Sequence, residues 1–126
     1  MGEDRVIVFL DDDPNRAALQ FNRMTKEDRE RTFWVKTVEE AIGMLKDYRS
    51  RLDIVSLDHD LCGETYVHSG REDCGMEVVR WLEKQDSERY SHVKFVVHTW
   101  NIPAGMKMAS RLIQKGYRVV REPFGS

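Results

Sequence analysis

Five short apolar segments alternate with four amphipathic segments along this chain, and no other feature constrains its fold as strongly. The apolar segments hold many β-branched and aromatic residues and are bounded by polar, turn-forming residues, which is typical of buried strands. They predict strands at residues 5–10, 32–35, 54–57, 93–97 and 117–120. Because crossovers between parallel strands are right-handed and carry helices, the alternation predicts an α/β fold whose parallel sheet is covered on both faces.

The expected helices carry their own start and stop signals. Asp13 can cap a helix that has Pro14 in its first turn, where a missing N–H costs nothing. Residues 37–40, Thr-Val-Glu-Glu, form a capping box for a second helix. A third helix is expected over residues 75–84, and a fourth begins at Pro103 and stops at Gly116.

Length and composition limit what kind of protein this is. A chain of 126 residues is long enough for one core and too short for two, so we predict a single domain over residues 1–126. No apolar run approaches the roughly 20 residues that span a bilayer. The N-terminus is polar and acidic where a secretory signal would be basic and then apolar. We therefore expect a cytoplasmic protein that spans no membrane.

Cysteine spacing and net charge narrow the expected partners. Cys62 and Cys74 lack the CxxC spacing of a zinc site, and in a reducing compartment we interpret both as free thiols. The formal net charge is only −2, so no overall basic field indicates nucleic acid. An RNA partner would therefore have to be bound by a small local group of residues.

Polar residues gather where three of the predicted strands end, and in a parallel sheet ligands collect at that edge. The three clusters are Asp11, Asp12 and Asp13; Asp58, His59 and Asp60; and His98, Thr99 and Asn101. Carboxylates from two strand ends repel one another unless they share a cation, and oxygen ligands suit Mg²⁺ or Mn²⁺. We predict Asp11, Asp12 and Asp58 as the metal ligands. Helix capping is the alternative for the first cluster, and it fully explains Asp13.

Three motifs resemble the receiver domain of two-component signalling. Residues 8–14, VFLDDDP, are similar to its acidic pair; residues 56–61, SLDHDL, to its phosphoacceptor strand; and residues 121–124, REPF, to its Lys-Pro-Phe ending. The resemblance implies a flavodoxin-like three-layer sandwich with a five-stranded parallel sheet of order 2-1-3-4-5. One departure concerns function, because Glu122 stands where receivers have the lysine that contacts the phosphoryl group.

Where the sequence differs from signalling receivers, it resembles a specific offshoot of them. This is the cyclic-phosphate-processing receiver family, which includes phage-encoded modifiers of tRNA. Its hallmarks match SLDHDL and residues 97–108, VHTWNIPAGMKM, where Thr99 replaces a serine. The resemblance implies a phosphoesterase that acts on cyclic phosphate ends of RNA, with tRNA among the candidate substrates.

Opening a 2′,3′-cyclic phosphate requires an activated water, neutralised phosphoryl oxygens and a proton for the departing ribose oxygen. His59 and His98 titrate in the right range to move protons, and Thr99 and Asn101 can donate hydrogen bonds to nonbridging oxygens. We predict these four residues as catalytic. The alternative is that each histidine is an ordinary hydrogen-bonded residue beside a strand end.

Three further residues are predicted to bind substrate. Trp100 follows the fourth strand end and can stack a base, although covering the core is an equally open alternative. Arg71 and Lys107 can hold phosphates, whereas charged residues in loops and on helices are more often solvated.

The rival hypothesis is a noncatalytic receiver-like module, which either accepts a phosphoryl group on Asp58 or binds a partner protein. Glu122 and the paired histidines favour the enzyme, since a signalling receiver requires lysine at the former position and has no use for the latter.

Overall fold

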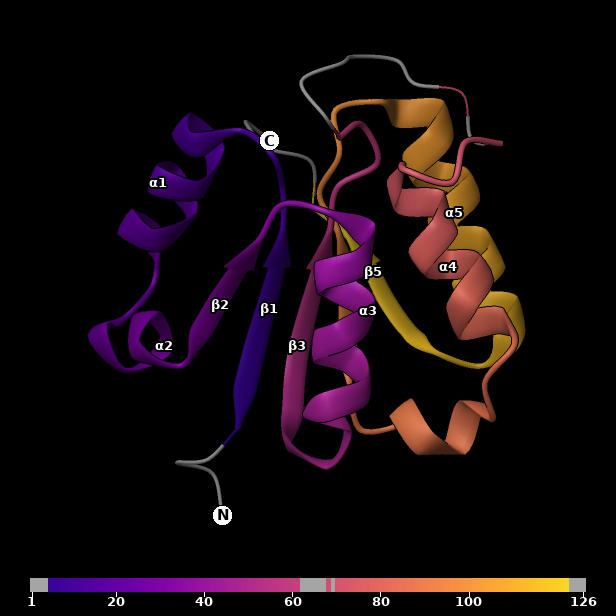
Figure 1. Ribbon diagram of the computed structural model, residues 1–126, viewed down its shortest axis with the longest axis horizontal. Coiled ribbons are helices and arrows are strands. Elements are labelled where there is room, and N and C mark those ends of the chain that lie inside the picture. The colour runs from indigo at the N-terminus through magenta and orange to yellow at the C-terminus, as the bar shows by residue number, and fades with distance from the viewer. Residues whose placement is uncertain (1–4, 62–67, 69, 123–126) are drawn as a thin grey trace.

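The computed structural model describes residues 5–61, 68 and 70–122, and within them a five-stranded parallel sheet forms the centre of the molecule (Figure 1). The strands are β1 (Val6–Leu10), β2 (Thr32–Val35), β3 (Leu52–Leu57), β4 (Lys94–Val97) and β5 (Arg118–Arg121). Their order is β2-β1-β3-β4-β5. The predicted receiver-like topology is confirmed, and each strand lies within two residues of its expected start.

Helices connect the strands, and two 3-10 turns precede β3 and β4. The helices are α1 (Pro14–Arg23), α2 (Lys26–Glu30), α3 (Val38–Asp47), α4 (Gly75–Glu83) and α5 (Ile102–Lys115); the turns are η2 (Arg49–Arg51) and η3 (Ser87–Tyr90). The sequence pattern did not predict α2, whose sequence KEDRE has no apolar residue and so no hydrophobic periodicity. In the described part of the chain, no helix combines the length and apolar character needed to cross a membrane.

The two faces of the sheet are covered by different helices. Alternate strand residues such as Val8 and Leu10 belong to the main core, together with Leu45 of α3, Leu82 of α4 and Leu112 of α5. The intervening residue Phe9 packs instead with Ala17 of α1 and with Trp34. The result is a three-layer sandwich in which α1 lies on one face and α3, α4 and α5 on the other.

The register of the central strands determines which side chains meet at their carboxyl ends. Leu10 of β1 is paired with Leu57 of β3, which is paired in turn with Val97 of β4. The amide of Asp58 donates to the carbonyl of Leu10, and the amide of His98 donates to that of Leu57, both over 3.0 Å. Residues 11, 58 and 98 therefore stand side by side, all on the α1 face, because each follows a residue that points into the main core.

A glycine allows α4 to begin directly against the loop that follows β3. A Cβ atom on Gly75 would lie 1.8 Å from the carbonyl oxygen of Asp58. We expect Gly75→Ala to lower the free energy of unfolding by at least about 1–3 kcal/mol, because the rigid backbone must shift to remove this overlap. Urea denaturation of the purified variant measures this change.

Gly43 is the matched control, since it lies inside α3 and a Cβ there meets nothing within 4 Å. Gly43→Ala should raise stability by about 0.5–1 kcal/mol, because alanine has less backbone freedom to lose in a helix. Equal effects of the two substitutions would contradict the close packing at Gly75.

Candidate functional site

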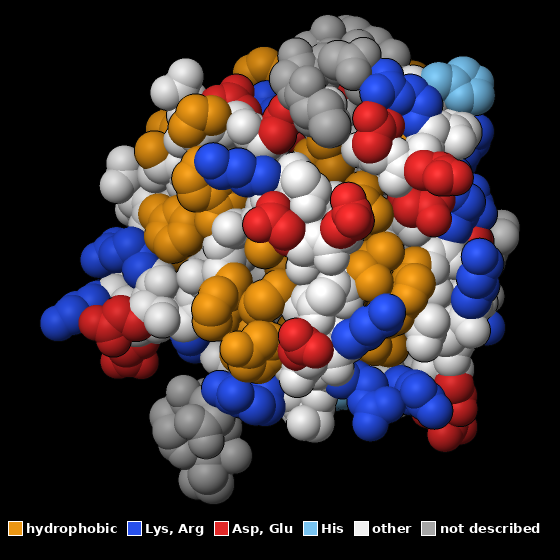
Figure 2. All heavy atoms as spheres, in the orientation of Figure 1, with side chains coloured by type: hydrophobic (Ala, Val, Ile, Leu, Met, Phe, Trp, Pro, Cys, Tyr) orange, Lys and Arg blue, Asp and Glu red, His pale blue; other side chains and the backbone are white. Residues whose placement is uncertain are grey.

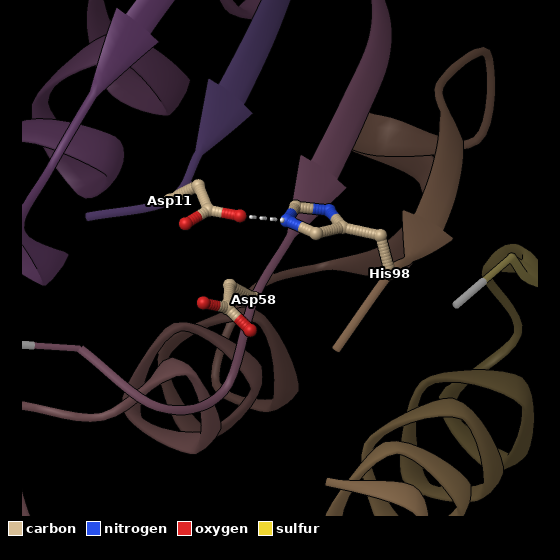
Figure 3. A group of neighbouring side chains, drawn as sticks. All are labelled: Asp11, Asp58 and His98. Atoms are coloured by element: carbon tan, nitrogen blue, oxygen red, sulfur yellow. Dashed lines mark hydrogen bonds and ion pairs between the residues drawn. The ribbon is translucent and has the colours of Figure 1, made fainter. Parts of the chain in front are cut away.

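Three buried side chains meet at the carboxyl edge of the sheet. Asp11 follows β1, Asp58 follows β3 and His98 follows β4; one donor atom from each lies within 4.8 Å of the other two (Figure 3). His98 Nε2 is 3.0 Å from Asp11 Oδ2. We call these three residues the central group. None of them is more than 3% exposed, so their charges interact away from bulk water.

Arg16, in the first turn of α1, provides the positive charge for these carboxylates. Its Nη2 atom lies 2.9 Å from Asp11 Oδ1, 3.6 Å from Asp12 Oδ1 and 3.2 Å from Asp58 Oδ2. Its Nε donates to Asp11 Oδ2 over 2.9 Å. One nitrogen of Arg16 thus contacts all three of these carboxylates, and the prediction that Asp11, Asp12 and Asp58 hold a metal stays a prediction. Sequence reasoning did not identify Arg16, although its spacing of five residues after Asp11 on a capped helix was a usable signal.

The two buried carboxylates have opposite pKa shifts. Burial alone would raise the pKa of Asp11, but hydrogen bonds from His98, Arg16 and the Asp13 amide outweigh burial and lower it. Burial raises the pKa of Asp58 to about 6; the charge of His98 opposes this shift and the charge of Asp11 adds to it. The site therefore pairs a firmly ionised carboxylate with one that holds its proton more tightly.

Neighbouring side chains determine how the imidazole of His98 is oriented. Its Nδ1 lies 2.7 Å from the hydroxyl of Ser56, and its ring stacks on Phe9 with centroids 4.6 Å apart and planes inclined by 12°. Because the ionised Asp11 carboxylate can only accept, Nε2 carries the proton that it shares with Asp11. The Ser56 hydroxyl is the hydrogen-bond partner of Nδ1, which accepts in the neutral ring and donates in the protonated ring. His98 thus presents an N–H group to the centre of the site.

Backbone and indole contacts fix Asp11 from the other side. The indole Nε1 of Trp34 donates to the Asp11 carbonyl over 2.7 Å, and the Asp13 amide donates to Asp11 Oδ1 over 2.9 Å. Asp13 itself caps α1 by accepting from the Asn15 amide, as predicted. Trp34 is partly buried against Phe9 and Ala17, and its indole contributes directly to positioning Asp11.

His59 points away from the central group. Its side chain is fully buried, and its Nδ1 lies 2.8 Å from Asp60 Oδ1. Burial alone would lower its pKa, but hydrogen bonds with Cys74 and Asp60 raise it. The alternation of β3 continues past Leu57, so Asp58 and His59 face opposite sides of the sheet. Cys74 is buried, and Cys62 lies outside the described residues, so the prediction that both are free thiols is not tested.

Thr99 and Asn101 build the turn between β4 and α5. Thr99 Oγ1 accepts from the Asn101 amide over 3.1 Å, and Asn101 Oδ1 caps α5 by accepting from the Ala104 amide over 3.3 Å. Asn101 Nδ2 also donates to Asp60 Oδ1 over 3.2 Å. These bonds connect α5 to the loop after β3. They also use the side-chain atoms of Thr99 and Asn101 that we predicted to contact the substrate.

The three predicted substrate-binding residues lie outside the central group. Trp100 is 59% exposed, so it does not cover the core. Arg71 forms an ion pair with Asp73 over 2.6 Å, and Lys107 is exposed on α5. On the face seen in Figure 2, acidic and basic side chains are interspersed, so basic residues do not gather there into one broad patch.

A cavity of about 510 Å³ lies on the α1 face of the sheet and reaches His98 and Ser56. Its floor includes Phe9 and Val96. Glu122, which stands where receivers have lysine, lines this cavity, and its amide donates to the Val97 carbonyl over 2.9 Å. Arg121, the last residue of β5, lines the same cavity.

The donor set of the central group fits a divalent cation. The carboxylates of Asp11 and Asp58 lie close enough to share one ion, and Asp12 is linked to them through Arg16. Such oxygen ligands suit Mg²⁺ or Mn²⁺, while His98 keeps its Nε2 proton beside them. A cation on Asp11 and Asp58 would compete with Arg16 for the same oxygens.

Comparisons with known proteins concern the fold and the family of this chain. No curated protein matches the sequence. Solved structures also match, and the three that follow are among them. The signal receiver domain of a Luxo repressor protein from Vibrio parahaemolyticus is 22% identical, with a TM-score of 0.54 over 96% of this chain and 81% of that one. A two-component response regulator with a GGDEF domain is 13% identical, with a TM-score of 0.60 over 98% of this chain and 44% of that one.

A chain from the complex of the CheA3 P1 domain with CheY6 from R. sphaeroides is 19% identical, with a TM-score of 0.52 over 98% of this chain and 85% of that one. At these identities the likeness shows the receiver fold alone. The family described as the cyclic-phosphate processing receiver domain matches residues 6–114, which include the whole central group. The chain belongs to the family of cyclic-phosphate processing receiver domains.

Proposed function

We propose that this protein is a phosphoesterase, dependent on Mg²⁺ or Mn²⁺, that opens cyclic phosphates at the ends of RNA, tRNA included. The central group supports this proposal most directly, because it places a proton-bearing imidazole beside two carboxylates at the ligand-binding edge of the sheet. The family match to cyclic-phosphate processing receivers points to the same substrate chemistry.

Each residue of the site has a distinct part in the proposed reaction. Asp11, Asp12 and Asp58 would hold the cation, which supplies charge neutralisation at the phosphoryl oxygens and lowers the pKa of the attacking water. His98 gives its Nε2 proton to the departing ribose oxygen while a P–O bond to that oxygen breaks. The water oxygen forms the new P–O bond and loses a proton to solvent. Imidazole then regains a proton from solvent.

Substrate contacts outside the central group involve the exposed residues. Trp100 is two residues beyond His98 and largely exposed, which suits stacking against the terminal base. Arg71 and Lys107 would contact phosphates farther along the RNA. Their positive charges would strengthen binding without making it specific for a base sequence. A net charge of −2 provides no overall basic field, so we confine the proposed contacts to a short site at the RNA end.

A direct assay tests this function. RNA oligonucleotides ending in 2′,3′-cyclic, 2′ and 3′ phosphates are incubated with the protein in EDTA, Mg²⁺ or Mn²⁺, and the ends are identified by mass spectrometry. We expect loss of the cyclic end with a gain of 18 Da for one water, only when a divalent cation is present. Cyclic ends that survive under all three conditions would refute the proposal.

The second candidate is a phosphoaccepting receiver, favoured by the position of Asp58 after β3 and by the likeness to signal receiver domains. We expect acetyl phosphate with Mg²⁺ to leave no long-lived phosphoaspartate, because His98 lies within 4.8 Å of the Asp58 carboxylate and can assist its hydrolysis. Intact-mass spectrometry checks this. A stable, stoichiometric adduct that disappears in Asp58→Asn would favour signalling over the phosphoesterase.

A further inference from the structure

Arg16 occupies the position between carboxylates that a divalent cation would take. Its Nη2 lies 2.9 Å from Asp11 Oδ1 and 3.2 Å from Asp58 Oδ2, and its Nη1 lies 3.4 Å from Asp13 Oδ2. A Mg²⁺ or Mn²⁺ ion bound about 2.1 Å from the same oxygens leaves no room for that nitrogen. An ion held by these oxygens would therefore compete with the guanidinium for them.

A receiver-type phosphate site also needs a second cation, and Glu122 stands where receivers have the lysine that supplies it. The cavity beside His98 is lined by Glu122 and by the basic residues Arg23, Lys94 and Arg121. Among the described residues that contact the carboxylates of the central group, Arg16 is the basic side chain. A guanidinium is permanently charged and matches two oxygens of a phosphoryl group with its planar fork.

From these two observations we propose that Arg16 is the phosphate-binding cation of this site: it neutralises the carboxylates until a divalent cation binds them, and then contacts the phosphoryl oxygens. The inference deepens the proposed function by assigning a residue for recognising the phosphate. Arg16 can make this exchange without unfolding α1, because its side chain is 24% exposed and extends from the first helical turn.

Mn²⁺ binding to the full chain tests the first half of the proposal. We expect Arg16→Gln to bind Mn²⁺ about tenfold or more tightly than the wild type in electron paramagnetic resonance titrations, because a competing positive charge has been removed at about 3 Å from the ligand oxygens. Arg89→Gln removes the same charge in η3, before β4 and outside the cavity, and it should leave the affinity within about twofold. Equal or weaker Mn²⁺ binding by Arg16→Gln, or no binding by either protein, would overturn the competition.

Inorganic phosphate tests the second half at saturating Mn²⁺. Isothermal titration of phosphate should show about tenfold or greater loss of affinity in Arg16→Gln, since a charge-assisted contact is lost. Arg16→Lys should recover part of that affinity, and Arg89→Gln should behave as the wild type. Unchanged phosphate affinity in Arg16→Gln would overturn the phosphate contact even if Mn²⁺ binds more tightly.

Further measurements distinguish effects on binding from effects on folding and on turnover. Without metal, Arg16→Gln should melt at a lower temperature because three carboxylates lose their counter-charge, and saturating Mn²⁺ should restore it. If Arg16→Gln does not fold, Arg16→Lys carries the same two tests, with smaller changes in the same directions. Both titrations are independent of catalysis, so a wild type that hydrolyses no cyclic phosphate but gives these binding results would refute the function and retain the role of Arg16.

Discussion

His98→Ala should lower the turnover of a cyclic phosphate by roughly 10²- to 10⁴-fold, the usual contribution of general acid or base catalysis. The structural reason is that Nε2 carries a proton into the centre of the site, 3.0 Å from Asp11 Oδ2. Single-turnover rates on a short RNA with a 2′,3′-cyclic end, at saturating Mn²⁺, provide the measurement. A rate within a few fold of the wild type would mean that His98 has a structural role and is not the general acid.

Two controls separate proton transfer from packing. The imidazole also stacks on Phe9, so His98→Ala leaves a space that costs stability, and its folded fraction has to be verified by circular dichroism. Imidazole added to the solution should restore part of the activity in that space. Ser56→Ala keeps the ring and removes its Nδ1 partner, so we expect a smaller loss of turnover and a shifted pH profile.

Asp58→Asn should stabilise the metal-free protein by about 3 kcal/mol at pH 7.5. The pKa of Asp58 rises from 3.8 to about 6 on folding, a change of roughly two units, and each unit corresponds to about 1.4 kcal/mol. Because the folded state holds this proton more tightly than the unfolded state, the wild type loses stability as the pH rises from about 4 to about 6 and is level above that. The asparagine variant lacks this loss.

Urea denaturation in EDTA at pH 4.5, 6 and 7.5 measures the effect. Asp12→Asn is the matched control; its carboxylate is more exposed, with 15% of the side chain accessible, so removing its charge should change stability less. Mn²⁺ should stabilise the wild type and have little effect on Asp58→Asn. A variant less stable than the wild type at pH 7.5 would mean that the bonds from Arg16 and the His59 amide outweigh the burial of the charge.

The ionised Asp58 carboxylate lowers the stability of the folded protein, and a bound cation would reduce this loss. The carboxylate is 2% exposed, and it lies close to the ionised Asp11. Arg16 offsets part of the repulsion in the absence of metal. A divalent cation would offset more of it, which links metal binding to stability in this site and makes thermal melting a sensitive readout of occupancy.

The local pattern of the sequence determined the sheet and the place of the site. Periodicity and capping residues specify strands and helices over short windows, and parallel strands bring their carboxyl ends to one edge wherever they are adjacent. Asp11, Asp58 and His98 were therefore predictable as neighbours at that edge. Helix α2 was not, because a five-residue helix of charged residues has no apolar periodicity and is stabilised by the Thr25 cap and its surroundings.

Only the tertiary structure decided which polar side chains face one another. His59 turns to the opposite side from Asp58 because strand alternation continues past the end of β3, and Thr99 and Asn101 engage in the turn into α5. Arg16 reaches Asp58, which is 42 residues away, because α1 packs on the same face to which Asp58 points. Such contacts depend on the angle between a helix and the sheet and on the reach of a long side chain, and neither is encoded in residue spacing.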